Sequence, residues 1–170
     1  MKSLADVAVN LLGAAAILLT SCAKTPATGT SDAAPARQVS FSLPSDDGNL
    51  VTVPLPNMTT VVDAWAPTCK PCREKLPALY ARRAEIEAHG GKLVLVAVLS
   101  EAESTEDARA ALTSWGVSAP FLIDRGDVLR REAGVNSLPA TLVLDEQQHV
   151  RWVAPPNASA DDVVAAVSLR

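Results

Sequence analysis

In several stretches of the chain, hydrophobic residues alternate with polar residues or form short continuous runs. Turn-forming residues separate these stretches. Strand patterns, either alternating or continuously apolar, occur at residues 39–43, 50–55, 60–64, 121–124, 140–145 and 150–153. Residues 92–99 are almost continuously apolar, which is typical of a central strand covered on both faces. The first two strands lie on either side of a turn-forming segment, residues 44–49, which predicts an N-terminal β-hairpin.

Apolar residues at helical spacing alternate with these strands. One helix is predicted to begin near Pro71 and to end at Gly90, with a kink at Pro77. Three further helices are predicted at residues 105–115, at residues 127–133 and after Ser159. This order predicts an α/β fold with a mixed central sheet and helices on both faces.

The first 38 residues have a different composition. Residues 1–21 combine Lys2 with a short apolar stretch, which indicates a signal peptide. The segment ends in Leu-Thr-Ser before Cys22 and resembles the bacterial lipoprotein processing site, which implies lipidation of Cys22. An ordinary secreted protein or an uncleaved anchor is the alternative. Residues 23–38 are rich in Ala, Thr, Ser and Pro, which predicts a flexible linker. Residues 39–170 then form one domain.

Composition limits the classes of function. The chain has 170 residues, of which 48% are hydrophobic, so it can bury a substantial core. Its net charge is −4, with acidic and basic residues interspersed. A nucleic-acid-binding domain typically carries a basic stripe, so we expect no nucleic-acid partner.

The candidate chemistry lies in Cys69-Lys70-Pro71-Cys72, directly after the strand at residues 60–64 and at the start of a helix. Two cysteines at this spacing can close into a disulfide. A helix N-terminus favours the thiolate form of the first cysteine, and the thiolate is the species that attacks disulfides. Lys70 adds positive charge, which should lower the pKa of Cys69 further. The motif therefore predicts thiol-disulfide exchange.

The Cys motif follows Trp65, and a separate Leu138-Pro139-Ala140-Thr141 motif precedes the last hairpin. With the order of elements, these motifs resemble the thioredoxin superfamily, and within it the TlpA/ResA-type membrane-tethered thiol-disulfide oxidoreductases. The resemblance covers about residues 39–169 and implies a thioredoxin-like three-layer fold. The sequence departs from the family at Thr68, where many relatives have an aromatic residue. It also has Lys75 where ResA-like members often have Glu.

The resemblance implies roles for individual residues. Cys69 would be the nucleophile and Cys72 the resolving thiol, while Pro139 would be the cis-proline beside them. Asp63 would be a buried acid that takes or gives the proton of Cys72, unless it is a plain strand-end carboxylate. The predicted substrate contacts are Trp65, Thr68, Lys70, Pro71 and Leu138. For Trp65, packing in the core is the alternative.

These observations predict an extracytoplasmic thiol-disulfide oxidoreductase, anchored by lipid in the bacterial cell envelope and monomeric. It would reduce protein disulfides and be recharged by a membrane electron donor of the thiol-disulfide type. The Cys69–Cys72 disulfide would be its redox centre, without a further cofactor. Two alternatives are a redoxin-type peroxidase that uses Cys69 and a metal-binding or chaperone module. Zinc prefers four N/S ligands, and beyond the cysteine pair only His89 and His149 remain, so no metal site is predicted.

Overall fold

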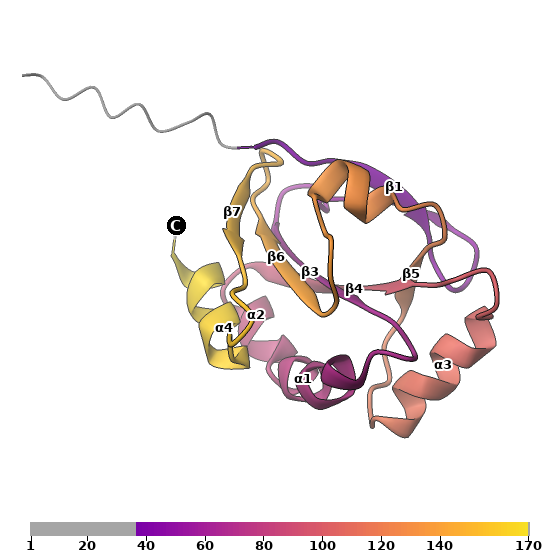
Figure 1. Ribbon diagram of the computed structural model, residues 1–170. Helices are drawn as coiled ribbons and strands as arrows, with labels where there is room; N and C mark the ends of the chain where they lie inside the picture. Colours follow the sequence, from indigo (N-terminus) through magenta and orange to yellow (C-terminus); the bar gives the residue numbers. More distant parts are fainter. Residues whose placement is uncertain (1–36, 170) are drawn as a thin grey trace, which may run out of the picture. The chain divides into compact units, whose positions relative to one another are not determined.

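A five-stranded mixed sheet forms the centre of the domain in the computed structural model, which describes residues 37–169 (Figure 1). The strands are β3 (Thr59–Trp65), β4 (Gly91–Val98), β5 (Phe121–Asp124), β6 (Ala140–Leu144) and β7 (Val150–Val153). They are arranged in the order β5-β4-β3-β6-β7, with β3, β4 and β5 parallel and β6 antiparallel to both β3 and β7. The mixed sheet confirms the sequence-based prediction, and the apolar strand β4 is an interior strand that pairs with β5 on one side and β3 on the other.

The predicted N-terminal hairpin forms a separate two-stranded sheet of β1 (Phe41–Pro44) and β2 (Leu50–Val53). A bridge from Ser45 to Leu122 connects it to the outer strand β5 of the main sheet. Just before the hairpin, Gln38 forms a bridge with His149 at the start of the other outer strand, β7. The segment from Gln38 to Ser45 therefore crosses the sheet from one edge to the other.

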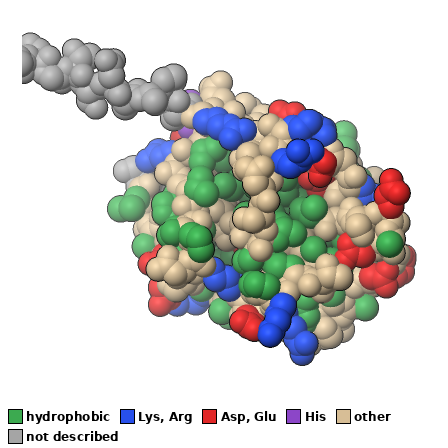
Figure 2. Space-filling model, in the orientation of Figure 1, with side chains coloured by type: hydrophobic (Ala, Val, Ile, Leu, Met, Phe, Trp, Pro, Cys, Tyr) green, Lys and Arg blue, Asp and Glu red, His purple; other side chains and the backbone are tan. Residues whose placement is uncertain are grey.

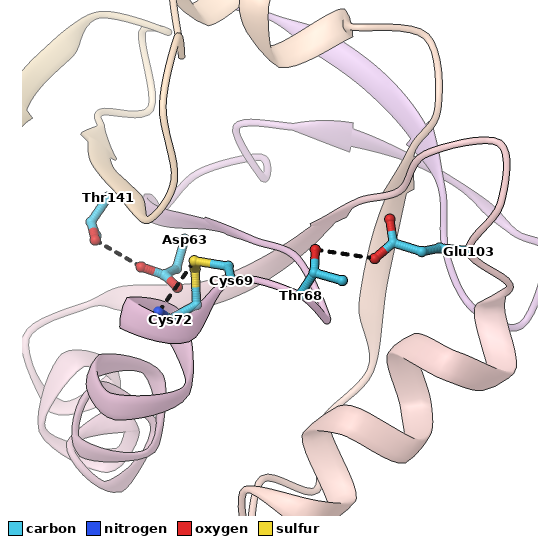
Figure 3. Close-up of a disulfide and its surroundings, with 6 residues drawn as sticks. All are labelled: Asp63, Thr68, Cys69, Cys72, Glu103 and Thr141. Atoms are coloured by element: carbon cyan, nitrogen blue, oxygen red, sulfur yellow. Dashed lines mark hydrogen bonds between the residues drawn. A yellow bond between two sulfur atoms is a disulfide. The ribbon is translucent and has the colours of Figure 1, made fainter.

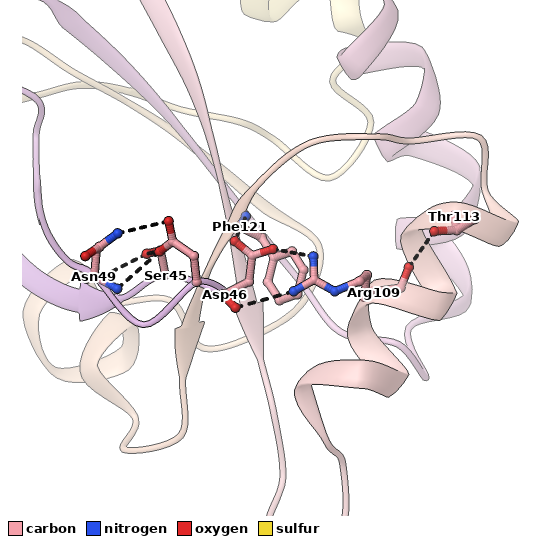
Figure 4. A network of polar contacts seen from close by, with 7 residues as sticks. Ser45, Asp46, Asn49, Arg109, Thr113 and Phe121 are labelled. Atoms are coloured by element: carbon pink, nitrogen blue, oxygen red, sulfur yellow. Dashed lines mark hydrogen bonds and ion pairs between the residues drawn. The ribbon is translucent and has the colours of Figure 1, made fainter.

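An ion pair fixes the turn of the hairpin to helix α3 (Thr105–Ser114). Arg109 donates to the Asp46 carboxylate at 2.7 Å, and its guanidinium lies 5.6 Å from the centre of the Phe121 ring (Figure 4). The Asp46 backbone N–H also donates to the Phe121 carbonyl at 2.9 Å. The Asp46 side chain is only 8% exposed, so this pair is less screened by solvent than a surface ion pair.

The two faces of the sheet have different covers. Side chains alternate along β3, so that Val62 and Ala64 pack against the hairpin and a short π-helix, η1 (Leu129–Ala133). Val61 and Trp65 point to the other face, where they pack with residues of the α-helices. These helices are α1 (Lys70–Ala81), α2 (Arg83–Ala88), α3 and α4 (Ala160–Ser168) (Figure 1). Helical elements lie on both faces, as predicted, but the four α-helices between residues 37 and 169 share one face.

The single helix predicted from Pro71 to Gly90 is instead divided at Arg82 into α1 and α2. The Arg82 backbone leaves the helical region (φ −90°, ψ 4°), and its side chain pairs with Glu85 and with Asp161 of α4. Pro77 lies inside α1 and has no N–H for the preceding turn. The division falls five residues later than the expected kink, where contacts with another helix hold Arg82.

Basic and acidic side chains are interspersed on the face shown in Figure 2, with hydrophobic side chains between them. This face has no continuous basic area of the kind that binds a nucleic-acid backbone. Between residues 37 and 169, none of the helices has the length and apolar character needed to cross a bilayer.

Gly91 provides a test of packing between β4 and the helices. A Cβ atom at this position would lie 2.9 Å from Val167 Cγ1 and 3.2 Å from the Ile86 carbonyl oxygen. Gly91→Ala should therefore lower the free energy of unfolding by roughly 1–3 kcal/mol, as overpacked core substitutions do. Gly126→Ala is the matched control, because a Cβ at Gly126 meets nothing within 4 Å. Urea denaturation of both variants checks this; equal stabilities would contradict the packing described.

Candidate active site

Cys69 and Cys72 form a disulfide at the junction between β3 and α1, with their Cα atoms 5.3 Å apart (Figure 3). The chain turns after Trp65, and the Cys69 N–H donates to the Ala66 carbonyl at 3.0 Å. Cys69 is the N-cap of α1, and its sulfur accepts the backbone N–H of Cys72 at 3.2 Å. The helix therefore begins at the residue predicted to be the nucleophile.

The two sulfurs have different surroundings. Cys69 is half-buried, whereas Cys72 is fully buried in the cluster that contains Trp65 and Leu76. Lys70 and Pro71 between them are exposed, and Pro71 stands in the first helical turn, which contains no acidic residue. After reduction, the helix N-terminus and Lys70 would both favour a negative charge on Cys69. An external disulfide can reach Cys69 but not Cys72.

Trp65 is completely buried, which corresponds to core packing, one of the two roles that the sequence left open for it. Its indole packs edge-on against Trp115 at 5.4 Å and Phe121 at 5.8 Å, measured between ring centroids. Trp115 follows α3 and Phe121 begins β5. Trp65 therefore packs in the core beneath the turn that carries Cys69. Other residues form the surface around Cys69.

Asp63 lies two residues before Trp65 on the same face of β3 and is 4% exposed. Its register partner on β6 is Thr141, whose hydroxyl donates to the Asp63 carboxyl at 2.7 Å (Figure 3). Burial raises the pKa of Asp63 to about 7, although the Thr141 hydrogen bond and the charge of Lys75 both oppose the rise. Burial decides the direction because an ionised carboxylate loses its hydration in the core. At neutral pH this carboxyl can both accept and donate a proton.

The Leu138–Pro139 peptide bond is cis, as the resemblance implied. Leu138 is half-buried and packs against the clusters on both faces of the sheet, including the one that contains Cys69 and Cys72. Pro139 directly precedes β6, whose Thr141 contacts Asp63. The two motifs that are 70 residues apart in sequence thus meet at one site.

Three interactions of the site were not predicted from the sequence. Thr141 belongs to the quoted proline motif, but its bond to Asp63 depends on strand register. Lys75 attracted notice only as a departure from relatives, yet it is the charge that acts on Asp63. The hydroxyl of exposed Thr68 makes a long 3.4 Å contact with Glu103, from the loop before α3. No sequence pattern indicated Glu103.

The other residues that the sequence analysis named lie away from this site or outside the described part. Cys22 and the segments at residues 1–21 and 22–36 lie outside the described residues. His149 lies against Asp145 and Gln38, on the β6–β7 turn. In the span 37–169, no three side chains of His, Cys, Asp or Glu are grouped as metal ligands would be.

The fold and the dithiol place the chain in the thioredoxin superfamily, with the TlpA/ResA-like features described above. The family described as Redoxin matches residues 30–167. The chain therefore belongs to the Redoxin family.

Relatives whose names describe thioredoxin-like proteins or thiol-disulfide oxidoreductases match part of the sequence. "Thioredoxin-like protein YneN" of Bacillus subtilis is 34% identical over 89 residues, which are 51% of this chain and 50% of the relative. "Thiol-disulfide oxidoreductase ResA" of Geobacillus thermodenitrificans is 24% identical over 99 residues, which are 58% of this chain and 55% of that protein. The matched segment thus spans about half the length of these two relatives.

Solved structures share the fold over most of this chain. StoA from Bacillus subtilis superposes with a TM-score of 0.62 at 20% identity, covering 78% of this chain and 98% of StoA. A thiol:disulfide interchange protein from Chlorobium tepidum gives a TM-score of 0.66 at 23% identity, covering 82% of this chain and 98% of the other. These likenesses confirm the thioredoxin-like fold.

Asp63 should make stability depend on pH. Its pKa is near 3.8 when unfolded and about 7 when folded. The folded state therefore holds the proton more tightly, and this stabilisation is full below pH 3.8 and lost as the pH rises through 7. Asp63→Asn, which removes the buried charge, should raise the free energy of unfolding at pH 8 by on the order of 3 kcal/mol. The gain should be much smaller at pH 4.

Urea denaturation at both pH values measures this difference. Asp162→Asn is a control of opposite sign, because hydrogen bonds from Ser159 lower the pKa of Asp162. That variant should lose stability at pH 8 rather than gain it. An Asp63→Asn gain that is the same at pH 4 and pH 8 would show that Asp63 does not hold its proton in the folded state.

Proposed function

We propose that this chain is a thiol-disulfide oxidoreductase that reduces disulfide bonds in other proteins. The observation that carries the proposal is the unequal pair of sulfurs at the start of α1. Cys69 is half-buried and caps the helix, while Cys72 is fully buried behind it. Catalysis of this kind needs one sulfur that meets the substrate and a second that only the first can reach. The names of relatives such as ResA support the same class.

The reaction would proceed in two exchanges. The Cys69 thiolate attacks one sulfur of the substrate disulfide, a mixed disulfide forms, and the other substrate sulfur leaves as a thiolate. Cys72 then gives its proton to Asp63 and attacks the Cys69 sulfur. The Cys69–Cys72 disulfide forms, the second substrate sulfur leaves, and both substrate thiolates take up protons. The substrate gains the two electrons that the dithiol loses, and a dithiol donor restores them.

Residues around the sulfurs would bind the substrate chain. Leu138 packs against the cluster that holds the dithiol, and Thr68, Lys70 and Pro71 are exposed beside Cys69. An extended substrate segment could lie along the backbone before Pro139, as strands add to an open edge. This placement would hold a substrate sulfur in line with Cys69.

The cell envelope is the proposed location, with Cys22 lipidated as the membrane anchor. The composition of residues 1–21 and the residues before Cys22 support this proposal. Stable anchoring needs more than one acyl chain, because a single chain binds a bilayer only marginally. The dithiol would then face an extracytoplasmic space, and a membrane protein of the thiol-disulfide class would return electrons to it. We propose that the domain acts as a monomer.

Thiol peroxidase activity is a second candidate, favoured by the match to the Redoxin family over residues 30–167. The Cys69 thiolate would attack one oxygen of the peroxide and break the O–O bond, so that a sulfenic acid forms and the other oxygen leaves as water or an alcohol. Cys72 would then attack the sulfenic sulfur and displace water to form the same disulfide. Comparing hydrogen peroxide consumption with insulin reduction, using one thiol donor for both, separates the two activities. Much faster peroxide consumption would favour the peroxidase.

Replacing the cysteines separates the two exchanges. Cys69→Ser should reduce insulin disulfide reduction to the uncatalysed rate, because no nucleophile remains at the surface. Cys72→Ser should also stop turnover, but should accumulate a mixed disulfide with protein substrates that dithiothreitol releases. Non-reducing gel electrophoresis followed by mass spectrometry measures the trapped species. The Cys69→Ser/Cys72→Ser variant is the control, and reductase activity in Cys69→Ser would contradict the mechanism.

The anchor has its own test. Cys22→Ser should leave the leader uncleaved by the lipoprotein peptidase, and globomycin should have the same effect on the unmodified chain. The measurement is the mass of the mature protein and its lipid adduct. A mature protein of unchanged mass under globomycin would show that Cys22 is not processed as a lipoprotein cysteine.

A further inference from the structure

A cleft of about 290 Å³ between α1 and α4 reaches the buried carboxyl of Asp63. Glu74, Lys75 and Leu79 of α1 line one side, and the start of α4 lines the other. Thr141, the hydrogen-bond partner of Asp63, also lines the cleft, but neither cysteine does. The cleft therefore approaches the buried Asp63 from a side that includes neither cysteine.

Lys75 is fixed within this cleft. It follows Cys72 by three residues and precedes Leu79 by four, so the three side chains share one face of α1. Lys75 is half-buried, and its Nζ donates to the Pro156 carbonyl at 2.7 Å, in the loop before α4. A charge-assisted hydrogen bond of this kind restricts an otherwise mobile side chain. The ammonium group is thereby held at the cleft that reaches Asp63.

Several other groups face the cleft or border it. Glu74 is exposed. At the start of α4, Asp161 pairs with Arg82, and Asp162 is held by the capping box of Ser159. From β6, the Thr141 hydroxyl donates to Asp63. On the other side of β3, the register neighbour of Asp63 on β4 is the apolar Leu95. Among these groups, Lys75 is the cation whose charge acts on Asp63.

We propose that Lys75 is a positioning residue: the Pro156 carbonyl holds its ammonium group at the cleft, where the positive charge favours the carboxylate form of Asp63 that accepts the Cys72 proton. Burial alone would leave Asp63 protonated over a wider pH range, and a protonated carboxyl cannot accept this proton. Lys75 thereby sets the pH at which the second exchange becomes fast. The inference rests on the proposed function, because it concerns the resolving step of that reaction.

The charge coupling can be measured directly on the full chain in its oxidised form. Carbon-13 NMR of labelled aspartate carboxyl groups gives the titration midpoint of Asp63, assigned with Asp63→Asn. Lys75→Met should move this midpoint upward by about one pH unit, the low end of the effect of a close opposite charge. Lys75→Arg keeps the charge and should restore the original midpoint. Lys92→Met is the matched control, because Lys92 pairs with Glu87 instead, and it should change nothing.

A second readout follows the reduced chain as it reacts with 5,5′-dithiobis(2-nitrobenzoate). The attack by Cys69 releases one coloured thiolate, and the attack by Cys72 on the mixed disulfide releases the second. In Lys75→Met, the pH profile of the second release should shift upward with the Asp63 midpoint, while the profile of the first release stays unchanged. Lys75→Arg and Lys92→Met should match the parent chain in both phases.

The outcomes separate this inference from the proposed function. An Asp63 midpoint unchanged in Lys75→Met would overturn the role of Lys75, whether or not the protein reduces insulin. A shifted midpoint with an unshifted second release would also overturn it. Parallel shifts in both measurements would support it. A parent chain that shows the coupling but reduces no protein disulfide would instead refute the proposed function and leave the coupling intact.

Discussion

Burial of the Asp63 carboxyl behind the disulfide is the constraint on which the arrangement of the site depends. Placing an ionisable group in a core is costly unless it is neutral or paired. Here the group is compensated by a hydroxyl from β6, and a fixed cation lies nearby on α1. These partners come from separate elements, so the strand register, the start of α1 and the loop before α4 must all be correct together.

The aromatic cluster beneath the dithiol supports the same arrangement. Trp65 ends β3, and its ring is held by Trp115 and Phe121, which come from the segment between β4 and β6. Asp46 and Arg109 connect that segment to the hairpin. Together these contacts support the turn between β3 and α1, which carries Cys69. A rigid base under Cys69 favours a fixed direction of approach for an external sulfur.

The features that could be predicted from the sequence are those that depend on residues close together in the chain. Cys69, Cys72 and Pro139 lie in short motifs whose spacing carries the chemistry, and the strands follow from alternation. Residues whose position depends on distant partners were harder to predict. The contact of Lys75 with Pro156 joins residues 81 positions apart, and Trp65 was not distinguished between surface and core. The division at Arg82 depends on Asp161, and local helical periodicity carries no information about that contact.

The segment between Gln38 and Ser45 has a consequence for solubility. Both outer strands of a sheet present unpaired backbone groups, which can recruit strands of other molecules and begin aggregation. Gln38 bridges to the start of β7, and Ser45 bridges to β5. One short segment of the chain therefore pairs with both edges of the sheet. A shortened version of the protein that begins after this stretch would expose the unpaired backbone groups of both outer strands, even with the Cys69–Cys72 disulfide in place.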